Sequence, residues 1–192
     1  MKNILIINGH PNPNSFNAAL ANAYAKGARE QDAIVSHIDI HALDFNPNLA
    51  YAYQQRMELE NDLKEAWDKI QKAEHLIWVH PVWWGGLPAK MKGFIDRLFL
   101  PGMAFKFRND SVRWDKLLAG KSARIIYTAD QPSWFYRFIN KRPSVHALKK
   151  MTLEFCGVKP VKKTMIGPVK SMTDIDRNKA LKKVYLLGKG MK

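Results

Sequence analysis

The feature that most constrains the fold of this chain is a regular alternation of short apolar runs with longer amphipathic stretches. The apolar runs have the length of strands, and the intervening stretches carry apolar residues at helical spacing. The runs expected to form strands are 2–8, 33–40, 74–80, 122–128 and 160–167. The stretches expected to form helices are 15–30, 54–73, 88–100, 144–155 and 174–187. This alternation predicts an α/β fold.

Strands that alternate with helices of these lengths build a parallel sheet with helices on both faces, and right-handed crossovers leave few topologies. Five strands favour a flavodoxin-like, doubly wound five-stranded parallel sheet, and residues 1–192 are expected to form a single domain of that fold. In such sheets a ligand binds beyond the carboxyl ends of the strands. A binding site is therefore expected in the loops after Asn8, His80 and Thr128.

The loop over residues 9–17 lies between a strand and an amphipathic helix and is suited to binding a phosphate. A helix N-terminus offers unpaired N–H groups and a partial positive charge. Asn14 and Ser15 are good capping residues whose side chains also bind phosphate oxygens, and His10 is a further donor. The loop has neither the Gly-Lys-Ser/Thr ending of a Walker loop nor a Gly-x-Gly-x-x-Gly pattern. The alternative is a capped helix with no ligand.

The loop after the third strand carries two tryptophans next to two glycines, which is an unusual composition for a structural turn. Large rings at such a place need a partner, and the planar ring system of a flavin is a suitable one. We expect the backbone of residues 81–85 to bind the polar edge of such a ring and Trp84 to flank it, while Gly85 leaves room for its approach. The alternative is that Trp83 and Trp84 are core residues.

Together these loops resemble the NAD(P)H quinone oxidoreductase family, which includes DT-diaphorase and shorter bacterial flavoproteins. The first motif is Gly9-His-Pro-Asn-Pro-Asn-Ser-Phe-Asn17, and the second is Pro81-Val-Trp-Trp-Gly-Gly-Leu-Pro-Ala-Lys-Met-Lys-Gly-Phe-Ile-Asp-Arg97. The resemblance runs from the first expected strand to about the fourth, and more loosely to the C-terminus.

The resemblance implies a flavodoxin-like homodimer that binds FAD, or FMN in its place, and uses NAD(P)H as co-substrate. Its reaction would be a ping-pong hydride transfer to a quinone-like acceptor. The residues that match the family's cofactor-phosphate positions are His10, Ser15, Phe16 and Asn17. The residues that match the positions lining the isoalloxazine ring are Pro81, Val82, Trp83 and Trp84.

The third loop departs from the family pattern. Thr128 and Ala129 match, Asp130 stands where the family has a glycine, and the tyrosine and histidine that follow in the family have no aligned counterpart. We expect residues 128–131 to bind the cofactor and to supply backbone donors to the negative charge that develops on a reduced flavin. The aromatic residues within 134–138 are expected either to form a lid or to lie in a dimer interface.

The remaining reactive side chains indicate no separate site. Cys156 is the one cysteine, which excludes a disulfide within one chain and favours a reducing, cytoplasmic location. The histidines have no metal-ligand spacing, so no metal is expected. No catalytic acid or base is assigned, and Tyr136 is the one candidate proton donor.

The net charge of +14 comes from 31 Lys and Arg against 17 Asp and Glu. Because these cations form no block and do not interleave with aromatic residues, a nucleic-acid partner is not expected. No apolar segment reaches the roughly 20 residues that span a bilayer. Two other functions stay open: a flavoprotein that regulates a membrane transporter as its peripheral partner, and a flavodoxin-type electron carrier.

Overall fold

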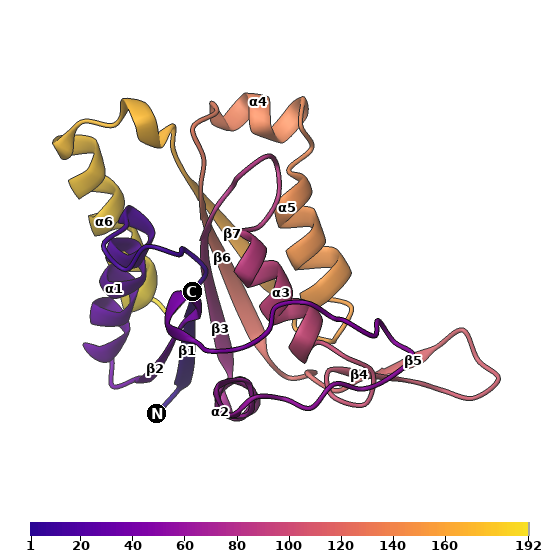
Figure 1. Cartoon of the computed structure of the whole chain (residues 1–192). Helices are drawn as coiled ribbons and strands as arrows, with labels where there is room; N and C mark the ends of the chain where they lie inside the picture. Colours follow the sequence, from indigo (N-terminus) through magenta and orange to yellow (C-terminus); the bar gives the residue numbers. More distant parts are fainter. Residues whose placement is uncertain (192) are drawn as a thin grey trace.

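The computed structural model of the chain describes residues 1–191 and contains a parallel sheet with the strand order β2-β1-β3-β6-β7 (Figure 1). The strands are β1 (Asn3–Asn8), β2 (Ile34–Asp39), β3 (His75–Pro81), β6 (Ser122–Thr128) and β7 (Val161–Ile166). Each strand overlaps the run in which it was expected. Because this is the doubly wound order of a flavodoxin-like sheet, the predicted α/β fold class is confirmed.

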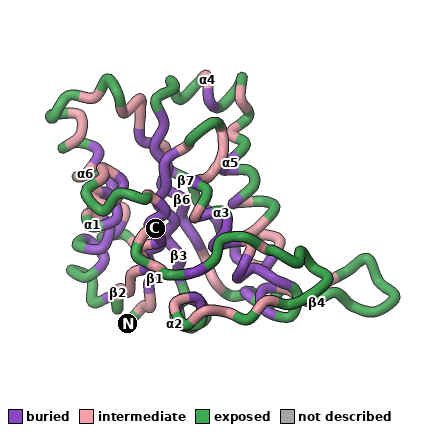
Figure 2. Tube along the Cα trace, viewed as in Figure 1, coloured by how far each residue is buried: buried purple, intermediate pink, exposed green. Residues whose placement is uncertain are grey.

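Helices cover both faces of this sheet (Figure 1). One face is covered by α1 (Phe16–Arg29) and α6 (Asp174–Lys189). The other is covered by α2 (Asn61–Lys72), α3 (Ala89–Leu98), α5 (Pro143–His146) and the π-helical segment η2 (Ala147–Leu153). Figure 2 shows the result: the sheet is buried between the layers, and the helices expose their outer sides. The chain also contains two short 3₁₀ turns, η1 (Ile40–Ala42) and η3 (Val169–Ser171).

The order of the strands decides where a site can form. Strand β3 is buried at every residue and lies between β1 and β6, with which it pairs in parallel. The loops that follow these three neighbouring strands therefore leave the sheet at the same edge. The first, second and third loops of the sequence analysis are the loops that meet there.

The helix that follows the first loop is held in place by an unusually close contact with α6. A Cβ atom added at Gly27 would collide with the carbonyl oxygen of Tyr185, and one added at Gly188 would collide with the carbonyl oxygen of Tyr24. The two helix backbones approach this closely because glycine has no side chain. This contact fixes α1, and with it the first loop, against the sheet.

One helix begins later than the sequence pattern predicted. Helix α2 begins at Asn61 instead of residue 54. The reason is the buried Arg97 of α3, which donates two hydrogen bonds to the Glu60 carboxylate at 3.0 and 2.8 Å and others to the carbonyl groups of Asn46 and Glu58. These bonds hold residues 46–60 in an irregular path along α3, and a helix over this segment would break them.

Two further features of the fold were not expected from the sequence. A two-stranded antiparallel hairpin consists of β4 (Phe105–Phe107) and β5 (Trp114–Lys116), and a short helix, α4 (Ser133–Phe138), follows the third loop. The helix expected over 144–155 exists, but it continues as a π-helix from Ala147. Strands of three residues and helices of six are too short to leave a periodic pattern in a sequence.

Candidate functional site

A cavity of about 340 Å³ lies where the three loops meet. It brings together ten of the residues that the sequence predicted as a cofactor site, which are His10, Ser15, Phe16, Asn17, Pro81, Val82, Trp83, Thr128, Ala129 and Asp130. Two residues that sequence reasoning missed also line it, Asn12 of the first loop and Val169 of η3. Of the predicted residues, Asn14, Trp84 and Gly85 do not line this cavity. We call it the loop cavity.

The first loop is held rigid by a series of hydrogen bonds from one side chain to the next backbone group. Asn8 donates to Asp39 at 3.0 Å and accepts from the N–H of His10 at 3.2 Å. His10 Nδ1 accepts from the N–H of Asn12 at 3.0 Å, and the Asn12 side chain accepts from the N–H of Asn14 at 2.8 Å. The donors of this loop are therefore positioned before a ligand arrives.

His10 is a neutral donor in this arrangement. Because its Nδ1 accepts a hydrogen bond, the hydrogen of the neutral ring is on Nε2. Burial lowers the pKa of His10, which favours the neutral form. The ring lies edge-on to Trp83, with 5.6 Å between the ring centroids, so the first and second loops are in contact.

The N-terminus of α1 opens at the same cavity. Ser15 is the N-cap and its Oγ accepts from the N–H of Ala18 at 3.2 Å, whereas Asn14 lies outside the helix. There is no acidic residue in the first turn of α1, so the partial positive charge of the helix end is not neutralised there. The Ser15 hydroxyl hydrogen and the first-turn N–H groups are suited to an anionic oxygen.

Among the residues that line the cavity, a buried polar pair leaves one donor unused. Thr128 donates from Oγ1 to Oδ1 of Asn17 at 3.0 Å, and both residues are buried. Within the described chain, Asn17 Nδ2 is buried and has no hydrogen-bond partner. An unpaired buried donor costs about 1–3 kcal/mol, so a ligand oxygen at this point would recover that energy. The donor set of the loop cavity thus fits a phosphate-bearing cofactor.

The second loop is a tight hairpin turn with an aromatic tip. Trp83 and Gly86 exchange two backbone hydrogen bonds, at 3.3 and 2.8 Å, and Trp84 and Gly85 between them both have positive φ, at 50° and 72°. Trp84 is fully exposed and Trp83 is about half exposed, so the alternative that both are core residues is wrong. A bulky residue in the left-handed region costs about 1–2 kcal/mol. Strain combined with exposure is typical of a residue that contacts a ligand or partner.

The third loop is fastened to the edge of the sheet. The N–H of Ala129 donates to Ile166 at 3.2 Å, its carbonyl accepts from Val169 at 3.1 Å, and Asp130 accepts from the N–H of Lys170 at 2.9 Å. Ala129 is therefore not one of the free backbone donors that we expected from residues 128–131. The third loop also holds the second loop in place, because the Thr128 carbonyl accepts a hydrogen bond from the N–H of Val82 at 2.8 Å.

The family follows from comparison with known proteins. The family model described as "Flavodoxin-like fold" matches residues 2–186. The chain belongs to this family. An uncharacterized NAD(P)H oxidoreductase of Haemophilus influenzae is 30% identical over 178 residues, which cover 90% of this chain and 87% of that protein. The ribosyldihydronicotinamide dehydrogenase (quinone) of Pongo abelii is 29% identical over 185 residues, which cover 82% and 78% of the two chains.

A solved structure confirms that the likeness extends over the whole fold. The crystal structure of Smu.1420 from Streptococcus mutans has a TM-score of 0.85 to this flavodoxin-like chain and 34% sequence identity. The match covers 98% of this chain and 99% of that one. The resemblance that the first two loops indicated is therefore confirmed.

In this member of the flavodoxin-like family, the candidate proton donor Tyr136 is in the core. Its hydroxyl group pairs with Ser144 Oγ at 2.7 Å, and burial raises its pKa. It does not line the loop cavity. Cys156 is also buried, and burial raises the pKa of its thiol to about 12, so it is a protonated core residue.

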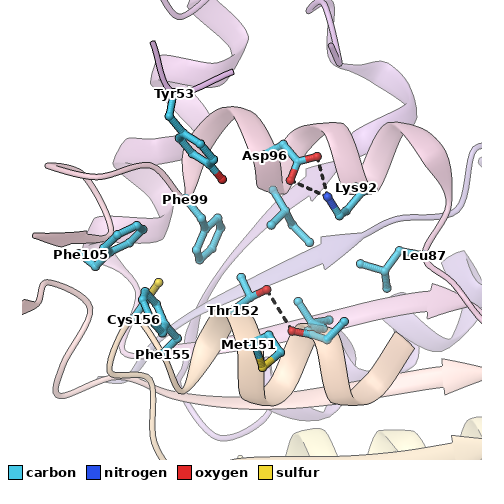
Figure 3. Close-up of a pocket in the computed structure, with 13 residues that line it drawn as sticks. Tyr53, Leu87, Lys92, Asp96, Phe99, Phe105, Met151, Thr152, Phe155 and Cys156 are labelled. Atoms are coloured by element: carbon cyan, nitrogen blue, oxygen red, sulfur yellow. Dashed lines mark hydrogen bonds and ion pairs between the residues drawn. The ribbon is translucent and has the colours of Figure 1, made fainter. Parts of the chain in front are cut away.

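A second cavity, of about 360 Å³, lies between α3 and η2 (Figure 3). Side chains of α3 and η2 face each other across it, and most are apolar. Lys92 and Asp96 pair at 2.7 Å along its α3 side. Met151 of η2 and Tyr53 are exposed at its rim. Over residues 1–191, no helix has the length and apolar character required to cross a bilayer.

The strain at Trp84 gives a prediction for stability. Asparagine tolerates the left-handed region, so Trp84→Asn should raise the free energy of unfolding by about 1 kcal/mol. Urea denaturation measures this. The matched control is Trp134→Asn, because Trp134 is also exposed but lies in helix α4. If both variants have the same effect, the strain at Trp84 is refuted.

The buried His80 gives a prediction for acid stability. Its Nδ1–H donates to the Pro81 carbonyl at 2.9 Å, its Nε2 is buried without a partner in the described chain, and burial lowers its pKa from 6.5 to about 4. Between these two pH values the unfolded chain binds the proton and the folded chain does not. The contribution of His80 to the free energy of unfolding should therefore fall as the pH drops from about 6.5 to 4, by at most about 3 kcal/mol.

The test of this prediction compares urea denaturation of the wild type and His80→Asn across that pH range. Asparagine keeps a donor for the Pro81 carbonyl and does not titrate. The wild type should lose stability more steeply than the variant. Parallel pH profiles would show that His80 does not carry the acid sensitivity.

Proposed function

We propose that this protein is a flavin-dependent oxidoreductase that passes hydride from NAD(P)H, by way of a bound FAD, to a quinone-like acceptor. The observation that carries the proposal is the loop cavity, where an open helix N-terminus and the unpaired Asn17 donor lie beside an aromatic wall. The names of the Haemophilus influenzae and Pongo abelii relatives support this reaction class. We also propose that residues 1–192 act as a single domain and that the protein is cytoplasmic.

The phosphate end of the flavin would be held by the first loop. His10 Nε2, the Ser15 hydroxyl and Asn17 Nδ2 are donors on the same side of the cavity. Phe16 is backed by Arg177, whose guanidinium lies 5.0 Å from the ring centroid. This cation adds to the positive potential that favours an anionic group near the helix end.

The ring end of the flavin would lie against the second and third loops. Pro81, Val82 and Trp83 line that side of the cavity, together with Thr128 at the end of β6 and Ala129 after it. When bound, the flavin supplies a centre that accepts and donates hydride. The protein's part is to orient the ring, and the hydrogen bond from Val82 of the second loop to Thr128 of the third is suited to that task.

The exposed Trp84 suits the place where substrates enter. The indole stands at the tip of a short turn next to Trp83, beyond the cavity wall. NAD(P)H and the acceptor would then bind in turn over the same face of the flavin, with Trp84 covering each of them from water. This use of one place by two substrates is the basis for proposing a ping-pong order.

The first test of the proposal is the cofactor itself. Protein purified without added flavin should absorb at about 370 and 450 nm, bleach with NAD(P)H and regain its colour with a quinone. The mass of the released chromophore should be that of FAD. If the mass is that of FMN, the identity of the flavin is corrected and the rest of the proposal stands. A colourless protein that takes up neither flavin would overturn the proposal. Flavin binding without NAD(P)H oxidation would favour the electron carrier or the transporter regulator.

The second test concerns the unpaired donor. Asn17→Asp keeps the acceptor for Thr128 but replaces the free donor with a carboxylate oxygen, so flavin affinity should fall at least about tenfold. Asn14→Asp makes the same change three residues away, outside the cavity, and is the matched control. Fluorescence titration of flavin-free protein measures both. Equal affinities would remove Asn17 from the site.

We further propose that the protein is a homodimer and that the cavity of Figure 3 is part of the interface, since apolar side chains line it and Met151 is exposed at its rim. Met151→Lys should shift the protein to monomers in sedimentation velocity, because a buried charge without a partner is costly. Ile175→Lys on α6 is the control, since both side chains are 66% exposed. A wild-type monomer would refute the dimer.

A further inference from the structure

A third cavity, of about 320 Å³, lies between helix α4 and residues of β6 and β7. Figure 1 shows α4 beyond the ends of these strands. The cavity is lined by two kinds of side chain, cations and aromatic rings. The lining residues are Tyr127, Ser133, Trp134, Arg137, Phe138, Arg142, Lys163 and Met165. We call it the α4 cavity. It is distinct from the loop cavity, with which it shares no lining residue.

The charge in the α4 cavity is one-sided. Arg137, Arg142 and Lys163 line it, and no described lining residue is acidic. None of these three cations is in an ion pair with a carboxylate anywhere in residues 1–191. Like charges gathered without a counter-charge repel one another, and a bound anion would turn that repulsion into attraction.

Lys163 shows the effect of this repulsion. Its pKa is lowered, first by burial and then by the positive charges of Arg142, Lys149, Arg137 and Lys150. Two of these neighbours, Lys149 and Lys150, are paired with Glu154 at 3.5 and 2.8 Å. Glu154 is therefore engaged with these two lysines, and the cations that line the cavity have no carboxylate paired with them within the described chain.

The position of Arg142 is maintained at a cost. Lys141 and Arg142 are successive residues with φ of 56° and 53°, in the left-handed region that most side chains avoid. Hydrogen bonds fix this turn, since Arg142 donates its N–H to Tyr136 at 3.1 Å and accepts from the N–H of His146 at 2.9 Å. Strained turns of this kind occur where a side chain must be placed for function.

The aromatic residues of the α4 cavity indicate what kind of group the ligand carries in addition to its anion. Trp134 and Phe138 are both exposed, on one side of a short helix, and the guanidinium of Arg137 lies 4.9 Å from the Phe138 ring centroid. Tyr127 forms the floor, and burial raises its pKa, so its hydroxyl group stays neutral and able to donate. Such a wall favours a planar ring, which stacks on aromatic faces and on guanidinium planes.

From these observations we propose that the α4 cavity binds an oxyanion carried by an aromatic ligand. Arg137, Arg142 and Lys163 contact the phosphate, sulfonate or carboxylate group, and Trp134 and Phe138 contact the ring. Arginine is suited to this task because its planar donors match the oxygens of such anions in pairs. The proposal does not depend on a bound flavin, since it rests on residues outside the loop cavity.

Two kinds of ligand carry both an aromatic ring and an oxyanion, a nucleotide and an acidic acceptor, and the experiment distinguishes them. Isothermal titration calorimetry would use adenosine 2′,5′-bisphosphate, which stands for a nucleotide phosphate, and 1,4-naphthoquinone-2-sulfonate, which stands for an acidic acceptor. At least one of them should bind the wild type at 150 mM salt. Arg142→Gln and Lys163→Gln should each weaken that binding about tenfold or more, as expected for the loss of a hydrogen bond to a charged group.

The matched control is Lys182→Gln, which removes one positive charge from the exposed side of α6. It should leave the affinity unchanged, which separates a site from general attraction to a basic protein. Arg142→Lys keeps the charge and should restore part of the affinity, while thermal unfolding of each variant confirms that it folds. Binding of only one probe supports the proposal and identifies the source of the anion.

Two results would overturn the inference. One is that neither probe binds at millimolar concentration. The other is that Arg142→Gln, Lys163→Gln and Lys182→Gln all reduce the affinity to the same small extent. The visible spectrum of the same samples reports on the flavin separately, so failure at the α4 cavity and failure of the proposed function give different results.

Discussion

The burial of three neighbouring strands from water on both faces is the constraint on which this structure depends. Strands β1, β3 and β6 are buried almost throughout and lie between two helical layers. Burial of this kind contributes about 25 cal/mol for each Å² of apolar surface, and it leaves polar chemistry to the ends of the strands. The loops beyond β1, β3 and β6 are therefore where a ligand meets polar side chains supported by a rigid sheet.

The loop cavity follows from that constraint. Each loop is fastened to the next element: Asn8 to Asp39 of β2, Val82 to Thr128, and Ala129 to Ile166 and Val169. The hydrogen bonds that fix the loops engage several backbone donors. The few donors that they leave unpaired determine which kind of ligand atom the cavity can bind. The unpaired groups are Nδ2 of Asn17 and the first turn of α1, which suit an anionic oxygen. The α4 cavity lies on the other side of the third loop and has the same preference for anions.

Part of this site was predictable because its signals are local. A loop that joins a buried strand to an amphipathic helix, with His10, Ser15 and Asn17 in it, indicates a phosphate site from the sequence, and the tryptophans beside Gly85 indicate an aromatic wall. Asn12 and Val169 were missed because neither belongs to a motif. Asn12 reaches the cavity through the hydrogen bond to His10, and Val169 reaches it through the bond to Ala129. The left-handed turn at Trp84 was also missed, since tryptophan does not favour that conformation.

The sequence by itself determined the alternation of strands and helices, because periodicity reports which faces must be buried, and this alternation favoured a doubly wound sheet with its loops at one edge. Only the tertiary structure decided what depends on contacts between distant residues. Arg97 moves the start of α2 by binding Glu60, Thr128 leaves one donor of Asn17 free, and Arg137, Arg142 and Lys163 gather around one cavity from three segments. The physical reason is that hydrogen bonds and charges act through space, whereas hydrophobic periodicity is written along the chain.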